Sequence, residues 1–119
     1  MQKLKISTQV VGSRKDIIKI KVSGFLDAHT VPEMEEVVQS LMKKGLYKMI
    51  VDLEELSYIS SAGLGVFMSV IGDIRDNRGD IILIRMPPKI FKVFDLLGFT
   101  EIFTMLNQEE EAIMAFNKN

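Results

Sequence analysis

The segment IVDLEELSYISSAGLGVF, residues 50–67, determines how the rest of the chain is interpreted. It begins as a short apolar run, which is typical of a buried strand, and continues into a polar loop predicted over residues 54–60. Beyond the loop, apolar residues recur at helical spacing and predict a helix from about Ser61 to Arg78. The segment is therefore predicted to be a strand that leads through a serine-rich corner into a helix.

Upstream of this segment, the pattern predicts a hairpin and a helix. Polar and apolar residues alternate over 4–10 and again over 18–22, which is typical of two antiparallel strands with one wet face. Thr30 and Glu33 have the spacing of a capping box, so a helix is expected to begin there. Gly45 suits the end of that helix, and a central strand follows over 48–53.

Downstream, the apolar run 81–84 predicts a strand that is buried on both faces. Pro87-Pro88 is expected to open a third helix, a short edge strand is expected within 99–105, and Asn107 with Glu110 predicts a capping box for a last helix. Strands that alternate with helices indicate a parallel sheet covered by helices. We therefore predict one α/β domain over 1–119, with a mixed sheet of four to five strands and about four helices in the order ββαβαβα(β)α.

Composition excludes several classes of protein. The 119 residues include 15 basic and 16 acidic side chains, for a net charge of −1, which lacks the electrostatic signature of a nucleic-acid binder. Cysteine is absent, and no apolar run approaches the roughly 18 residues of a membrane span. The N-terminus lacks the apolar core of a signal peptide. We expect a cytoplasmic protein that binds neither nucleic acid nor membrane.

The residues that follow the serine-rich corner place small side chains on one side of the predicted helix. At roughly 100° per residue, Gly65, Ser69 and Gly72 fall within about 60° of one another, near the direction of Ser61. A glycine inside a helix is less favourable than alanine by about 1 kcal/mol, so two on one strip need a reason. The strip is either a shallow channel that admits the backbone of another chain, or a close contact with a helix of this domain.

Ser60 and Ser61 lie where the predicted strand meets the helix, and the carboxyl ends of strands are where ligands and partners tend to bind. A phosphoryl group on Ser61 would add about 1.5 to 2 negative charges, which the unpaired N–H groups of a helix start accommodate. A docked partner would not tolerate that charge as easily. The alternative is that Ser60 or Ser61 only caps the helix.

Signatures of catalysis are weak. The Gly63-Leu64-Gly65 segment lacks the third glycine of a dinucleotide-binding fingerprint, and the chain has no Walker motif. A hydrolase that uses Ser61 would have to recruit His29, the only histidine, which is expected in a turn. Asp27 and Asp52 either orient a serine hydroxyl or cap a turn. We expect no enzymatic activity, no metal site and no cofactor.

These residues resemble STAS domains of the bacterial anti-sigma-factor antagonist type. The resemblance rests mainly on IVDL at 50–53 and LSYISSAGLGV at 56–66. It is supported by GFLDAHT at 24–30, which enters the first helix, and by LLGFTEIF at 96–103. The order of elements also matches, so the likeness covers nearly the whole chain and implies a single STAS-like domain.

The resemblance implies a small protein that binds an anti-sigma factor, itself a serine kinase, and so frees a sigma factor. Phosphorylation by that kinase reverses the binding, and a serine phosphatase restores the active form. In the family pattern Asp-Ser-Ser/Thr/Ala-Gly-Leu-Gly the accepting serine falls on Ser61, the aspartate falls on Ser60, and a second acidic position is kept as Asp27. Since the carboxylate before Ser61 is missing, Ser60 is a competing acceptor, and an adaptor module without a phosphorylation switch is the alternative. The expected partner-binding residues are Asp27, Ser57, Ser60, Ser61, Gly63, Gly65, Ser69 and Gly72.

Overall fold

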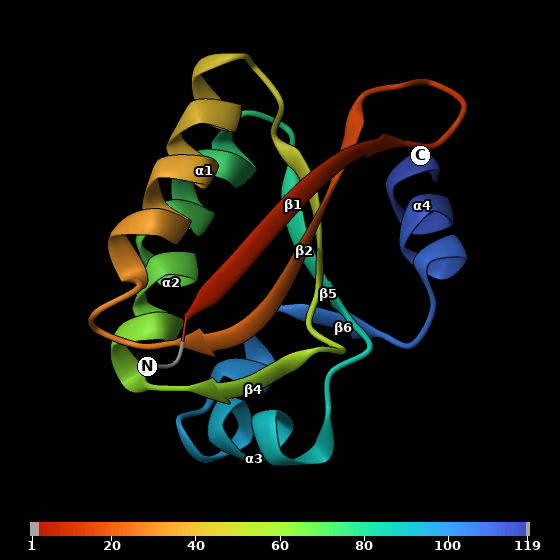
Figure 1. The fold of residues 1–119 in the computed structure, drawn as a ribbon. Coiled ribbons are helices and arrows are strands. Elements are labelled where there is room, and N and C mark those ends of the chain that lie inside the picture. Colours follow the sequence, from red (N-terminus) through yellow and green to blue (C-terminus); the bar gives the residue numbers. More distant parts are fainter. Residues whose placement is uncertain (1–2, 119) are drawn as a thin grey trace.

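A computed structural model describes residues 3–118 (Figure 1). These residues form six strands, four α-helices and one 3₁₀ turn. In chain order they are β1 (Leu4–Val11), β2 (Ile17–Leu26), α1 (Val31–Lys43), β3 (Lys48–Asp52), β4 (Leu56–Ile59), α2 (Ser61–Asp76), β5 (Asp80–Ile84), α3 (Pro88–Leu96), the 3₁₀ turn (Phe99–Glu101), β6 (Thr104–Leu106) and α4 (Glu109–Asn117). The predicted α/β class and the four helices are confirmed.

The strands form one mixed sheet in the order β1-β2-β3-β5-β6, and β4 pairs with β2 beside that path. β1 is antiparallel to β2, as the hairpin prediction requires, and every other pairing is parallel. The short strand expected within 99–105 is β6, at the edge of the sheet.

The predicted strand count of four to five is wrong, because the predicted loop 54–60 contains β4. β4 has only four residues, and Ser57 and Tyr58 in its middle are exposed. It joins the end of β2 beyond an irregularity at Gly24/Phe25, where the register shifts. This extra strand carries the chain directly to the start of α2.

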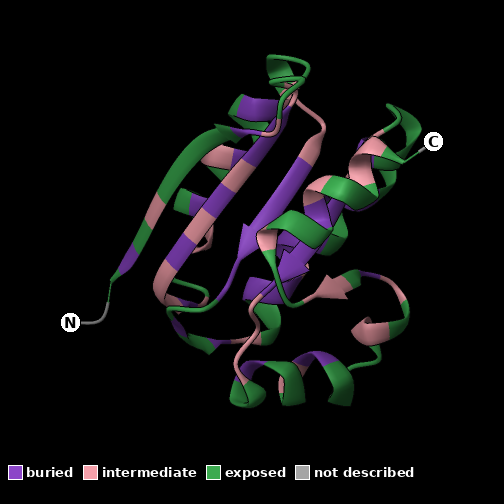
Figure 2. Ribbon diagram, turned by 90° about the vertical axis from the view of Figure 1, so that its right-hand side faces the viewer, coloured by how far each residue is buried: buried purple, intermediate pink, exposed green. Residues whose placement is uncertain are grey.

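Helices cover the two faces of the sheet unequally. In Figure 1, α1 and α2 lie on one side and α4 on the other, while α3 lies beyond the end of the sheet. β5 is buried on both faces, as predicted, whereas the outer strand β1 is largely exposed (Figure 2). The predicted apolar side of α2 is buried, except that Met68 at its margin is exposed. The buried side chains of α2 are Leu64, Val66, Phe67, Val70, Ile71 and Ile74.

Both predicted capping boxes are wrong in detail. Thr30 precedes α1, but its hydroxyl turns inward and donates to the carbonyl of Phe25 at 2.9 Å. At α4, the Glu111 carboxylate accepts from the backbone N–H groups of Asn107 (3.1 Å) and Gln108 (2.9 Å). The reaching carboxylate is therefore one residue later than the predicted Glu110.

Candidate functional site

Ser60 is the N-cap of α2. Its backbone is extended (φ −99°, ψ 172°), and its hydroxyl oxygen accepts a hydrogen bond from the N–H of Gly63 at 3.2 Å. Its own N–H donates to the carbonyl of Leu26 at 3.0 Å, which ties the helix start to the end of β2. Ser60 is half-buried, and its hydroxyl is occupied by the cap.

Ser61 is the first residue of α2, and its side chain is exposed. Within residues 3–118, its hydroxyl makes no hydrogen bond with another protein group. The two adjacent serines therefore differ: Ser60 holds the helix end together, and Ser61 presents a hydroxyl to solvent beside unpaired N–H groups of the first turn. The alternative in which Ser61 is the cap is excluded by this geometry.

The turn that precedes α1 is organised by Asp27. Its carboxylate accepts from the N–H groups of His29 (2.9 Å) and Thr30 (3.2 Å), and its own N–H donates to the Thr30 hydroxyl at 3.0 Å. Of the two roles left open for Asp27, the structure shows the turn cap. His29 is exposed in this turn, as expected, and forms no hydrogen bond with Ser61 in the described chain.

The turn before α1 and the start of α2 are in direct contact. Leu26 pairs with Ile59 across the parallel strands β2 and β4, so the segments that follow these two strands leave the sheet side by side. A Cβ on Gly63 would lie 2.5 Å from the carbonyl oxygen of Leu26, which only glycine avoids. Gly63 was expected to bind a partner, but it is buried against its own domain, and that expectation is corrected.

The strip of small residues on α2 faces outward. Nothing lies within 4 Å of a Cβ built on Gly65 or on Gly72, so the alternative of close packing inside the domain is wrong for both. Ser69 is exposed, and its hydroxyl donates back to the carbonyl of Val66 at 2.8 Å. The strip therefore continues the exposed surface of Ser61 along the helix.

Asp27, Ser57, Ser60 and Ser61 gather at one end of the molecule. They belong to the turn before α1, to β4 and to the start of α2, which lie together in Figure 1. We name the half-buried Asp27 and the exposed Ser57 and Ser61, with the strip Gly65, Ser69 and Gly72, the helix-start surface.

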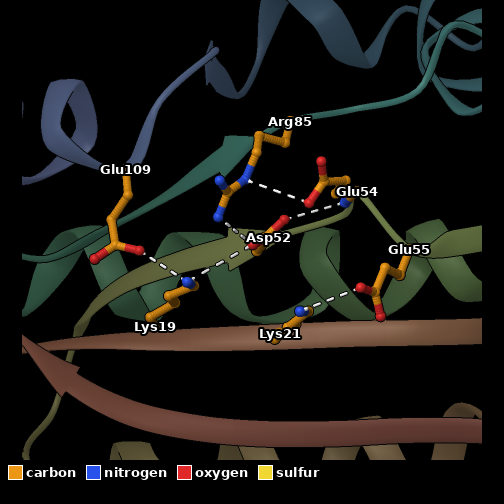
Figure 3. A network of polar contacts seen from close by, with 7 residues as sticks. All are labelled: Lys19, Lys21, Asp52, Glu54, Glu55, Arg85 and Glu109. Carbon is orange, nitrogen blue, oxygen red and sulfur yellow. Dashed lines mark hydrogen bonds and ion pairs between the residues drawn. The ribbon is translucent and has the colours of Figure 1, made fainter.

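Sequence reasoning missed a second polar group, a charged network on the α4 side of the sheet (Figure 3). Asp52 has only 1% of its side chain exposed and accepts from Arg85 at 2.7 Å and from the N–H of Glu54 at 3.1 Å. Lys19 lies 3.8 Å from Asp52 and 2.8 Å from Glu109 at the start of α4. Asp52 thus caps the turn after β3, the second of its two expected roles.

Burial alone would raise the pKa of Asp52. The hydrogen bonds from Arg85 and from the backbone of Glu54, together with the charges of Arg85 and Lys19, outweigh burial and hold that pKa below its ordinary value. The same contact with Asp52 raises the pKa of Arg85. No sequence signal marks this pair, because Asp52 and Arg85 are 33 residues apart and meet only through the pairing of β3 with β5.

Residues 3–118 contain neither a membrane-spanning helix nor a cluster of metal-binding side chains. No helix within 3–118 has the length and apolarity needed to cross a membrane. No group of three or more histidine or acidic side chains in that range is arranged to hold a metal ion.

The sequence pattern of the STAS domain matches residues 9–112. The chain belongs to the STAS domain family. It is 31% identical over 108 residues to an anti-sigma-B factor antagonist of Listeria monocytogenes, an alignment that covers 91% of this chain and 95% of the relative. It is 32% identical over 87 residues to the anti-sigma-B factor antagonist of Staphylococcus epidermidis, covering 73% of this chain and 81% of that protein.

Solved structures of the family share the fold of this STAS domain. The anti-sigma factor antagonist SpoIIAA in its unphosphorylated form superposes with a TM-score of 0.75 at 24% identity, covering 97% of this chain and all of that one. An anti-sigma factor antagonist from Mycobacterium paratuberculosis gives 0.85 at 16% identity, covering 98% and 96%. The Bacillus cell fate determinant SpoIIAA in its phosphorylated form gives 0.70 at 25% identity, covering 93% and 98%.

Proposed function

We propose that this STAS domain is an anti-sigma-factor antagonist that acts in the cytoplasm, binds an anti-sigma factor through the helix-start surface, and is switched off by phosphorylation of Ser61. The relatives named anti-sigma-B factor antagonist support the first part. The observation that carries the proposed binding and phosphorylation is the exposed hydroxyl of Ser61, the first residue of α2. This hydroxyl has no hydrogen-bond partner within residues 3–118.

The division of roles between the two serines selects the acceptor. Phosphorylation of Ser60 would turn the hydroxyl oxygen that accepts from Gly63 into a bulky phosphate ester oxygen, and would place a doubly charged group at a half-buried position against Leu26. A phosphoryl group on Ser61 instead projects into water beside the positive end of the helix. The domain therefore tolerates the modification at Ser61 far better than at Ser60.

The same modification opposes binding. A docked anti-sigma factor would bury the new charge without a compensating group, which is unfavourable by several kcal/mol, and each 1.4 kcal/mol lowers affinity tenfold. We propose that the anti-sigma factor is itself the serine kinase and that a serine phosphatase removes the phosphoryl group. The switch then works by charge at the interface, with no rearrangement of the fold.

The test is phosphorylation by the cognate anti-sigma kinase with ATP, followed by mass spectrometry of the intact domain and its peptides. We expect one phosphoryl group on the wild type and on Ser60→Ala, and none on Ser61→Ala. Phosphate found only outside residues 57–61 contradicts the site. In titration calorimetry, Ser61→Ala is expected to bind the anti-sigma factor like the wild type, and Ser61→Asp at least 100-fold more weakly.

The adaptor alternative predicts a different result. A STAS module without a switch would bind its partner stably, would not be phosphorylated at Ser61, and would show equal affinities for Ser61→Asp and Ser61→Ala. One observation favours this alternative: position 60 has a serine, whose hydroxyl caps α2, where the family pattern has a carboxylate.

A further inference from the structure

A cationic cleft lies at the end of the molecule opposite the helix-start surface. It has a volume of about 330 Å³ and is lined by Arg14, Lys48, Arg78, Asp80, Phe116 and Lys118, among others. These residues come from the β1–β2 turn, the starts of β3 and β5, and the end of α4, segments that meet at the top of Figure 1 near the C-terminus. An adjoining hollow of about 160 Å³ shares Lys48 and Arg78 with it.

The acidic side chains around this cleft are already neutralised. Asp80 pairs with Arg75 at 3.1 Å, and Asp16 in the adjoining hollow pairs with Lys48 at 2.9 Å. Arg14 and Arg78 are exposed and form no ion pair within residues 3–118. The cleft therefore carries uncompensated positive charge in a chain whose net charge is −1, and such a concavity attracts anions.

Arg78 lies in the turn that ends α2 and lines the cleft. Arg78 has a φ of 65°, which lies in the left-handed region. Glycine and asparagine adopt this region readily, whereas it is unfavourable by about 1–2 kcal/mol for other residues. The next residue, Gly79, is held so close to the carbonyl of Tyr47 that a Cβ there would clash with it. This contact fixes the backbone turn from which the side chain of Arg78 extends. The same turn ends α2, because the N–H of Gly79 donates to the carbonyl of Ile74 at 3.0 Å.

Phe116 and Ala115 add an apolar wall to the same cleft. Guanidinium groups bind phosphate oxygens in a bidentate geometry, and an aromatic ring beside them suits a flat or apolar substituent. We propose that this cleft binds a small organic phosphate, with the phosphate held by Arg14 and Arg78 and the organic part packed on Phe116. This site is separate from the proposed function at Ser61.

The experiment is an NMR titration of the ¹⁵N-labelled domain at low salt with phenyl phosphate, and in parallel with inorganic phosphate and with phenol. We expect saturable shifts at the amides of residues 14, 78–80 and 115–118 with phenyl phosphate, and at least fivefold weaker binding of inorganic phosphate. Phenol is expected to produce no saturable shift. Equal affinity for the two phosphates would overturn the organic part of the proposal.

Variants of exposed residues separate a site from general electrostatics. Arg14→Gln combined with Arg78→Gln is expected to lower the affinity for phenyl phosphate at least tenfold. Lys5→Gln combined with Lys92→Gln removes the same charge from exposed positions on β1 and α3 and is expected to leave the affinity unchanged. Unchanged binding in the arginine variant, or equal losses in both variants, would overturn the proposal. Far-UV circular dichroism and partner binding at Ser61 serve as independent checks on the fold.

Discussion

The charged network around Asp52 and the hydroxyls at the start of α2 are both polar groups at strand ends, yet they differ in how completely they are paired. Asp52 is buried and is met by Arg85, by Lys19 and by a backbone N–H. Ser61 is exposed, and its hydroxyl forms no hydrogen bond with a protein group within residues 3–118. A polar side chain whose partners are complete holds the fold together, whereas one without a hydrogen-bond partner can change without the loss of such a bond.

Solvation explains why the two regions cannot exchange roles. A buried carboxylate is tolerated only when opposite charge and hydrogen bonds replace the water it loses. A new group at Asp52 would break that balance and leave Arg85 and Lys19 without their shared partner. At Ser61 a new charge remains hydrated, so the folded state changes little until a partner covers it.

The largest expected effect comes from Asp52→Asn, which disrupts the fully paired network around Asp52. The substitution leaves Arg85 and Lys19 without their buried counterion, and we expect the free energy of unfolding to fall by about 3 kcal/mol. This is the low end of the range for a buried pair, because Arg85 keeps 31% of its side chain exposed. Urea unfolding at pH 7 measures it, and a loss below 0.5 kcal/mol would mean that the network is not structural.

The pairing of Asp52 with Arg85 predicts that the free energy of unfolding depends on pH. The folded-state pKa of Asp52 lies below its ordinary value of about 3.9, so its stabilising contribution is fully present above that value. The contribution is lost as the pH falls through the folded-state pKa. The difference in unfolding free energy between wild type and Asp52→Asn is therefore expected to be constant from pH 7 to pH 5 and to shrink below about pH 4. A difference that grows on acidification would contradict the lowered pKa.

Gly63→Ala tests the contact that brings the two helix starts together. The added Cβ would lie 2.5 Å from the carbonyl oxygen of Leu26 and 2.9 Å from its Cγ. Such overpacking against backbone typically reduces stability by about 1–3 kcal/mol, and we expect about 2. Chemical denaturation of the variant measures this loss.

Gly65→Ala is the matched control, two residues along the same helix. A Cβ at Gly65 meets nothing within 4 Å, and alanine is the better helix former by about 1 kcal/mol. We expect this variant to be as stable as the wild type or more so. If Gly65→Ala destabilised the domain as much as Gly63→Ala, the distinction between a glycine packed against Leu26 and a glycine beside open space would be wrong.

These two glycines also show where sequence reasoning succeeds and where it stops. Periodicity predicts α2 and its buried side chains, because burial of a helix face leaves a repeating mark in the sequence. It also places Gly63 on the side of the helix that faces the sheet and Gly65 on another side. It cannot show that the space at Gly63 is closed by Leu26, which lies 37 positions earlier in the chain. The pairing of Asp52 with Arg85 was missed for the same reason: partners that meet through the sheet leave no local pattern.

Short elements and caps were the other errors. β4 is four residues long and two of them are exposed, so no alternation accumulates before it ends. Thr30 has the residue type of an N-cap, but the carbonyl of Phe25 competes for its hydroxyl. Residue type predicts that a polar group lies at a helix start, and tertiary packing decides which atom it bonds.

Ser60→Ala has a smaller expected effect. It removes the acceptor for the N–H of Gly63, and loss of an N-cap typically reduces stability by about 1 kcal/mol. Thermal unfolding detects a change of this size in a domain of this length. Ser57→Ala, at an exposed position on β4, is the control and should change stability by less than about 0.5 kcal/mol.

Ser61→Ala has the smallest expected effect, and it tests most directly whether Ser61 lacks a structural role. Since its hydroxyl bonds to no group within residues 3–118, its removal should change the unfolding free energy by less than about 0.5 kcal/mol. Ser61→Asp should be as stable or slightly more so, by about 0.3–1 kcal/mol, because a negative charge in the first turn is favoured by the helix dipole. A stability loss in Ser61→Ala that matched Ser60→Ala would show that both serines hold the helix end, and a phosphoryl group on Ser61 would then disturb the fold itself.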